Sequence, residues 1–209
     1  MAPTRITKRV HKQSTLPATF FKKVGSDAKS SPTPTPSSVA RSKAKSRAAV
    51  AAVASDRVET DVLLAIQPLH LANIVAQRKN HEYRKYRLRD GVERLWLYET
   101  RGDKENKGRA AITHIATIPS DIRRTPGTVP EEPFGIGNSD FNAGLKQSKY
   151  GYPILELYKL VRPITLDEMK TTWGMGGAPM GWCFMKKNMW QDRWGNDEEG
   201  RQAIVTKIF

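Results

Sequence analysis

Between positions 79 and 89 the chain concentrates cations around one carboxylate. The group comprises Lys79, Glu82, Arg84, Arg87 and Arg89. Successive side chains of a strand point to opposite faces, so Glu82 and Arg84, two residues apart, are expected on the same face of a strand. Such a face could bind a polar ligand, because a carboxylate accepts hydrogen bonds and a guanidinium donates them.

A plainer interpretation of the same residues is also open. Glu82 and Arg84 could form only a partly exposed ion pair, which contributes little to stability. Several cations along one edge are more than one ion pair needs, however, and they are typical of a surface that meets nucleic acid. We therefore favour a binding site at this edge.

A strand, a helix and a second strand are expected to position these side chains. Residues 63–66 favour extended structure, and Pro68 is well tolerated in the first turn of a helix. The apolar residues that then recur at helical spacing are Leu71, Ile74 and Val75. Residues 82–87 follow as a strand in which Glu82 and Arg84 share a face.

This arrangement resembles the ASCH family, a branch of the PUA-like barrels, whose first strand ends at a proline before a helix closing on a G-K-K-x-x-E-x-R signature. The corresponding segment is QRKNHEYR, residues 77–84. Lys79, Glu82 and Arg84 agree with the signature, whereas Gln77 stands in place of the family glycine. The resemblance covers roughly residues 61–185. It implies an α+β fold, a PUA-like small β-barrel with short flanking helices.

The resemblance also implies a pocket between the first helix and the neighbouring strands. There Lys79 would supply a cation, Glu82 a base-edge acceptor, and Arg84 a donor to a phosphate or base edge. The expected ligand is RNA or DNA, with RNA favoured and a modified base among the candidates. Of the two tryptophans in a later glycine-rich stretch, Trp173 and Trp182, either could stack on a base or cover the core.

A hydrolase is a further alternative, because some ASCH proteins resemble amidohydrolases that act on acylated cytidine through a lysine, a threonine and a glutamate. Lys79 matches the lysine, and Glu99 is a candidate for the glutamate. Glu82 occupies the threonine position and cannot serve as a hydroxyl nucleophile. The histidines show no metal-ligand spacing, and the chain has no G-x-S-x-G motif. We expect no catalysis, metal or cofactor.

The remaining folded part is predicted to be rich in strands, within one domain spanning residues 58–209. Strands are expected at 92–98, 110–118 and 154–161, the last ending at Pro163, with Thr165 capping a short helix that runs through Lys170. The glycine-rich residues 135–142 could grip a phosphate or form a tight turn, with Asn138 or Ser139 as a helix cap. Trp190 and Trp194 suggest a helical C-terminal segment that packs on the barrel.

Residues 1–57 are predicted to be a disordered basic tail. They contain 12 of the Lys and Arg residues and only two Asp, so they carry +10 of the total charge of +14. Few bulky apolar residues interrupt this composition, which cannot offset the entropy lost on ordering. Such a tail could add salt-sensitive affinity for nucleic acid, or act as a nuclear import signal.

One segment of the tail is similar to the PCNA-interacting peptide, in which a glutamine, an aliphatic residue and two aromatics dock on a sliding clamp. The residues concerned are Gln13, Leu16, Phe20 and Phe21. Leu16 and Phe20 are separated by three residues, one more than the family pattern allows. A protein-interaction adaptor that docks through Phe20 and Phe21 on a clamp-like partner is therefore the principal alternative function.

A single cysteine, Cys183, excludes an intramolecular disulfide and a cysteine-based zinc cluster, and it suggests a reducing compartment. No apolar run is long enough to cross a bilayer, and the N-terminus is charged rather than signal-like. We expect no membrane partner and a nuclear location, with the cytoplasm as the alternative.

Overall fold

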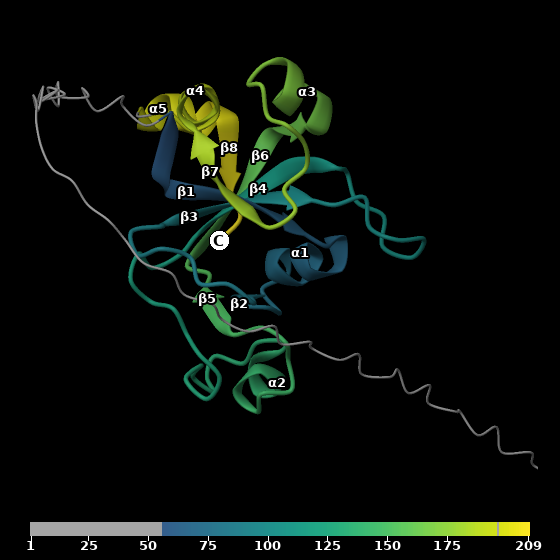
Figure 1. Cartoon of the computed structure of the whole chain (residues 1–209), viewed down its shortest axis with the longest axis vertical. Coiled ribbons are helices and arrows are strands. Elements are labelled where there is room, and N and C mark those ends of the chain that lie inside the picture. The colour runs from purple at the N-terminus through teal and green to yellow at the C-terminus, as the bar shows by residue number, and fades with distance from the viewer. Residues whose placement is uncertain (1–55, 196) are drawn as a thin grey trace, which may run out of the picture. The chain divides into compact units, whose positions relative to one another are not determined.

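The computed structural model describes residues 56–195 and 197–209, all within the second of two compact units, residues 50–209. The predicted tail, with Gln13, Leu16, Phe20 and Phe21, lies outside the described residues except for its last two positions. The elements in chain order are β1 (Arg57–Ile66), α1 (Pro68–Val75), β2 (His81–Arg84), β3 (Arg94–Glu99), β4 (Ala111–Thr117), α2 (Asn138–Asn142), β5 (Tyr150–Pro153), β6 (Glu156–Thr165), α3 (Leu166–Thr171), β7 (Trp182–Lys186), α4 (Lys187–Arg193), α5 (Glu198–Ile204) and β8 (Val205–Lys207). Figure 1 shows their arrangement.

Six strands form one mixed sheet in the order β7-β1-β3-β4-β6-β8, and β2 pairs with β5 in a separate ribbon. Only β1 and β3 run parallel among the pairs of the large sheet in the described residues. Because β1 and β3 are parallel, the chain must cross over between them, and this crossover carries α1 and β2. The α+β class with short helices is confirmed.

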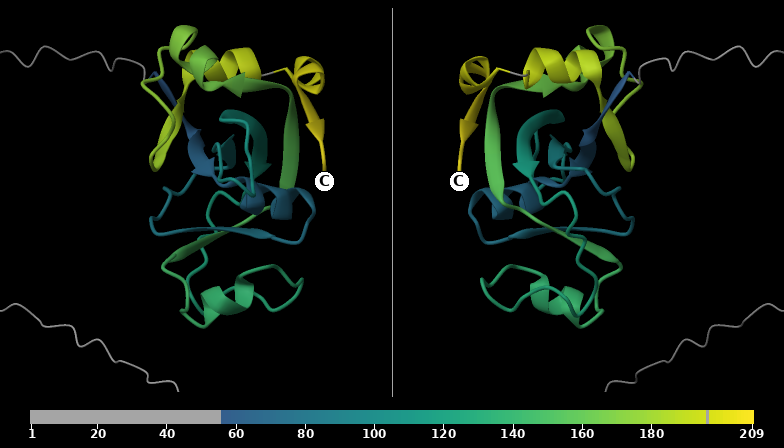
Figure 2. Two further views of the ribbon diagram at one scale, coloured as in Figure 1. Left: turned by 90° about the vertical axis from the view of Figure 1, so that its right-hand side faces the viewer. Right: turned by 90° about the vertical axis from the view of Figure 1, so that its left-hand side faces the viewer.

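The large sheet is curled and has β7 and β8 as its edge strands. No ladder joins the edge strands β7 and β8 within residues 56–195 and 197–209. The helices α4 and α5 connect these two strands along the chain, and Figure 2 shows them spanning the interval between the edges. The strands thus form a curled six-stranded sheet with β7 and β8 at its edges.

Both faces of β3, in the middle of the sheet, are buried. Leu95 and Leu97 belong to a core shared with Leu71 of α1. Trp96 lies in a second core with Met189 of α4. Full burial of a leucine side chain stabilises the fold by about 1.5–3 kcal/mol. The two cores fix β1 and β3 rigidly in the centre of the sheet.

Several predicted boundaries are correct and others are not. The Thr165 hydroxyl accepts a hydrogen bond from the Glu168 amide at 3.1 Å, so the predicted cap of α3 is confirmed. The strand before it continues through Pro163 to Thr165, because Pro163 falls at a register shift where its missing N–H interrupts no regular ladder. Strands β5, β7 and β8 had no counterpart in the prediction.

The glycine-rich connection forms a tight turn before α2. The helix cap is Gly137, with φ at 89°, and not Asn138 or Ser139 as predicted. The Asn138 side chain binds Tyr83 instead of capping the helix, since its oxygen accepts a hydrogen bond from the Tyr83 hydroxyl at 2.7 Å. A Cβ at Gly135 would lie 2.0 Å from the Asn80 side-chain oxygen, so close packing requires glycine there.

The C-terminal segment packs on the sheet as expected. Trp194, directly after α4, meets the rings of Trp96 and Tyr158 edge-on at 6.4 and 5.5 Å between centroids. None of the helices in the described part of the chain is both long and apolar enough to cross a membrane.

Candidate nucleic-acid interface

The three signature residues form one ion cluster at the end of α1 and along β2. A carboxylate oxygen of Glu82 accepts from the Lys79 ammonium, and the other lies 2.8 Å from Nη2 of Arg84. The side chains of Lys79 and Glu82 are 8% and 5% exposed, and that of Arg84 is 18% exposed. The spacing therefore predicted the contact correctly, but the pair is buried rather than partly exposed. We call Lys79, Glu82 and Arg84 the Glu82 cluster.

A left-handed residue turns the chain from α1 into this cluster. Gln77 has φ at 54°, and the amides of Arg78 and Lys79 both donate to the Asn73 carbonyl. A left-handed residue just after a helix usually is glycine, because a Cβ is strained there. Gln77 stands where the ASCH signature has glycine, and it adopts the left-handed conformation that glycine favours.

The Glu82 cluster carries a net positive charge. Burial alone would raise the pKa of Glu82, but Lys79 and Arg84 together hold it below the ordinary value, so the carboxylate is ionised. Partial burial and then the Lys79 charge lower the pKa of nearby His70. The cluster therefore holds two cations and one anion, and its neighbouring histidine adds no charge near neutral pH.

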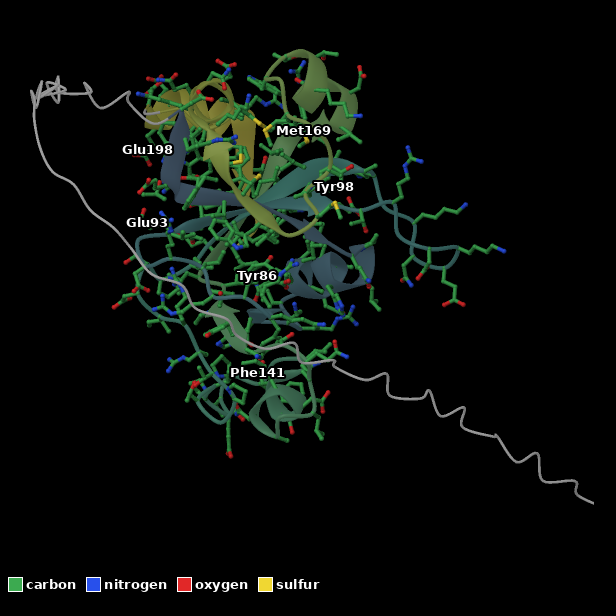
Figure 3. All side chains as sticks on the ribbon, in the orientation of Figure 1. Tyr86, Glu93, Tyr98, Phe141, Met169 and Glu198 are labelled. Carbon is green, nitrogen blue, oxygen red and sulfur yellow. The ribbon has the colours of Figure 1, made fainter. Side chains whose placement is uncertain are left out.

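Arg84 connects the cluster to the end of β1. Its Nη2 also donates to the Ala65 carbonyl at 2.6 Å, whereas its buried Nε has no hydrogen-bond partner within the described residues. The Tyr86 hydroxyl interacts with the same guanidinium. In the view of Figure 3, Tyr86 lies between the large sheet and the β2–β5 ribbon. The Arg84 guanidinium is thus held through Nη2, whereas its Nε makes no hydrogen bond in the described part of the chain.

Three half-buried aromatic rings continue from Arg84 across to β7. Tyr86 and Trp182 lie 6.4 Å apart, and Trp182 and Phe184 lie 5.1 Å apart, measured between ring centroids. The Arg89 guanidinium lies over the Phe184 ring at 5.5 Å. Trp182 is paired with Leu64 of β1, next to the Ala65 that binds Arg84. We call Tyr86, Trp182 and Phe184 the aromatic strip.

The other predicted site residues lie apart from this centre. Trp173 is 5% exposed, and its indole N–H donates to Asp192 at 2.7 Å, which favours the core alternative over base stacking. Arg87 is exposed and pairs with Asp90 at 2.8 Å, at the rim of the surface. Glu99, the guessed hydrolase glutamate, lines a groove together with Leu71 and Val75 rather than joining Lys79.

Phe184 and His70 were missed from the sequence. For Phe184 a signal existed, since Trp182 and Phe184 are two residues apart and share a face of any strand there. His70 carried no signal, because its proximity to the cluster depends on how α1 packs. Among the described residues, no group of three or more His, Cys, Asp or Glu side chains could hold a metal ion.

The sequence matches no protein-family model, and it matches no curated protein. The chain is similar to the crystal structure of ASCH from Zymomonas mobilis, with 16% identity and a TM-score of 0.45 over 64% of this chain and 93% of that chain. A serine-to-alanine mutant of the same protein gives 16% identity and a TM-score of 0.47, covering 65% and 95% of the two chains.

Proposed function

We propose that this protein binds single-stranded nucleic acid, RNA in preference to DNA, at the Glu82 cluster and the aromatic strip. The observation that carries the proposal is the surplus cation of the cluster beside three half-buried rings. Surfaces that bind single strands combine cations for the backbone with rings on which bases stack. RNA is favoured because its 2′-hydroxyl offers a hydrogen-bond partner to groups such as the Tyr86 hydroxyl.

Each group has a distinct part in this proposal. Arg84 contacts a phosphate or a base edge, since its side chain is the most exposed of the cluster. Glu82 orients Arg84 and Lys79 rather than reading a base, because both of its oxygens are engaged and buried. Trp182 offers a stacking face, and a modified base could take that position. Arg87 adds one phosphate contact at the rim.

The basic tail, residues 1–57, would add affinity that falls steeply with salt and does not depend on sequence. Docking of Phe20 and Phe21 on a clamp-like protein remains the rival to this part of the proposal, and a nuclear location would suit either role. Apolar docking should respond little to ionic strength, so salt dependence separates the two.

Fluorescence anisotropy of the full chain with labelled RNA and with DNA of the same sequence tests the proposal. Titrations at about 50 and about 200 mM salt measure how much of the binding free energy is electrostatic. Arg84→Gln should weaken RNA binding by roughly 10- to 100-fold, the value of one good arginine contact. Arg162→Gln is the matched control, because Arg162 is an exposed arginine on β6 and its loss removes the same charge.

Equal affinity of Arg84→Gln and Arg162→Gln would overturn the proposal, because any nucleic-acid binding would then belong to the tail. A preference for DNA over RNA of the same sequence would keep the site and reject RNA as its ligand.

A further inference from the structure

The helix α1 separates the Glu82 cluster from a groove on its other side. His70 interacts with the cluster, whereas the residues of α1 that line the groove are Pro68, Leu71, Ala72 and Val75. Their spacing places them on one helix face, and successive residues turn by about 100°. His70 is therefore nearly opposite that face, so ligands of the two sites would not compete directly.

The opposite wall of the groove is polar and comes from β4 and β6. His114 and Lys159 are paired across these strands, and Arg109 lies just before β4. The His114 Nδ1 is 2.8 Å from the Thr113 hydroxyl. Burial, and then the charges of Lys159 and Arg109, lower the pKa of His114 to about 4, so its ring is neutral near pH 7.

The charge of the groove is unbalanced. Arg109 and Lys159 form no ion pair among the described residues, and Glu99 is the single carboxylate in the lining. The lining thus has a net charge of one positive unit, and it also contains the neutral His114 imidazole. Nearby Ile208 adds to the apolar side formed by α1.

We propose that this groove binds a small organic anion that combines one acidic group with an apolar chain or ring. The apolar part would lie against Leu71, Ala72 and Val75, and the acidic group would meet Arg109 and Lys159. A cavity of about 350 Å³ is at the small end of the range for ligand sites, and it suits a molecule of this kind. The site is separate from the proposed nucleic-acid interface and does not depend on it.

Hexanoate is the probe, with hexanol and acetate as the matched compounds that lack either the charge or the chain. Amide chemical shifts of the full chain, recorded by NMR during titration, should show saturable changes at Ala72, Thr113 and Lys159 with hexanoate. Hexanol and acetate should bind at least tenfold more weakly. Equal binding of hexanol would overturn the proposal, because the cations would then contribute nothing.

Variants at one exposed position give the sharpest control. Ala72→Phe should fill the groove and weaken hexanoate binding at least tenfold, whereas Ala72→Ser leaves the groove open and should bind as the parent does. If Ala72→Phe binds hexanoate normally, the groove is not the site.

The charged wall is tested independently of the helix. Combined Arg109→Gln and Lys159→Gln should weaken hexanoate binding at least tenfold, and Lys104→Gln, at an exposed lysine outside the lining, should not. Unchanged binding in the double variant would reject the anion preference even if Ala72→Phe failed to fold. RNA affinity is measured in parallel. That of Ala72→Phe should stay within twofold of the parent.

Discussion

Two buried carboxylates, Asp61 and Glu82, hold arginines in different ways. Asp61 is fully buried and binds Arg94 through both oxygens at 2.8 Å, and it also accepts from the Trp96 indole at 2.8 Å. Glu93 adds a second negative charge beside Arg94 at 3.5 Å. Glu82 instead shares its two oxygens between two cations. One cluster has surplus negative charge and the other has surplus positive charge.

The difference separates a structural role from a binding role. The Asp61 cluster joins β1 to β3, and its arginine also lies over the Trp194 ring, so its groups already have partners. The Glu82 cluster has an unsatisfied Arg84 Nε and lies beside the aromatic strip. The sign of the surplus charge therefore separates the two clusters, since only a surplus positive charge beside aromatic rings suits the backbone and bases of a nucleic acid.

The largest expected effect is on stability, at the structural cluster. Asp61→Asn removes the buried charge partner of the Arg94 guanidinium and leaves only the exposed Glu93 beside it. Breaking a buried pair in this way should lower the free energy of unfolding by about 3–5 kcal/mol, measured by urea denaturation. RNA affinity of the folded variant should not change. A stability loss under about 1 kcal/mol would mean that the Asp61 cluster is not structural.

Acid pH should weaken the fold through histidines before it affects the Glu82 cluster. Burial lowers the pKa of His81 and of His114 to about 4, below the ordinary 6.5, so protons bind the unfolded chain first. This stability is complete above about pH 6.5 and is lost as the pH falls toward 4. At pH 5 each histidine should cost about 2 kcal/mol of unfolding free energy, measured by denaturation at each pH.

His114→Gln should remove the contribution of His114 to the pH dependence of the unfolding free energy and leave the contribution of His81. Glu82 stays ionised over the interval, because its pKa is below the ordinary value. RNA affinity should therefore keep its dependence on Arg84 down to pH 5. An unfolding free energy that is flat between pH 7 and 5 would contradict the burial of both histidines in neutral form.

Glu82→Gln distinguishes orientation from charge. The change raises the net charge by one unit, which by itself should strengthen RNA binding. If Glu82 orients Arg84, affinity should instead fall by about 5- to 10-fold, or about 1 kcal/mol. Anisotropy titrations of Glu82→Gln beside Glu93→Gln, which changes the same charge elsewhere, measure this difference. Tighter binding in both variants would show that Glu82 has no orienting role.

The smallest expected effect is a gain of stability at the turn into the Glu82 cluster. Gln77→Gly removes the strain of a side chain at φ of 54° and should raise the free energy of unfolding by about 1 kcal/mol. Ala76→Gly, at the preceding C-cap position where φ is −81°, should lower it, because glycine there only adds flexibility. RNA affinity should be unchanged in both. Destabilisation by Gln77→Gly would contradict the conformation of this turn.

Strong local patterns were predictable from the sequence. The helix after Pro68 and the strands β3 and β4 are correct because apolar spacing and length agree there with burial. β5 contains glycine and proline, and β8 has three residues, so neither carries a local strand signal. Their formation depends on distant partners, β2 and β6. The order of the strands in the large sheet also depends on pairing between distant segments, which no local pattern encodes.

For the candidate site, contacts within one strand were also predictable, whereas burial was not. Spacing along one strand brought Glu82 and Arg84 together correctly, because register within a strand is local. Trp173 and Trp182 stand in one glycine-rich stretch, and the sequence could not separate them. One became part of the core through Asp192 and the other joined the aromatic strip, since burial is decided by the elements that pack against each ring.

The most direct test of the proposed interface follows tryptophan indole signals by NMR while RNA is added to the full chain. The chain has five tryptophans, and Trp182→Phe and Trp96→Phe would assign the two signals that matter. The Trp182 signal should shift and saturate with RNA, whereas the signal of Trp96, which is bound to Asp61, should not move. RNA binding that leaves the Trp182 signal unchanged would contradict the assignment of function to the Glu82 cluster and the aromatic strip.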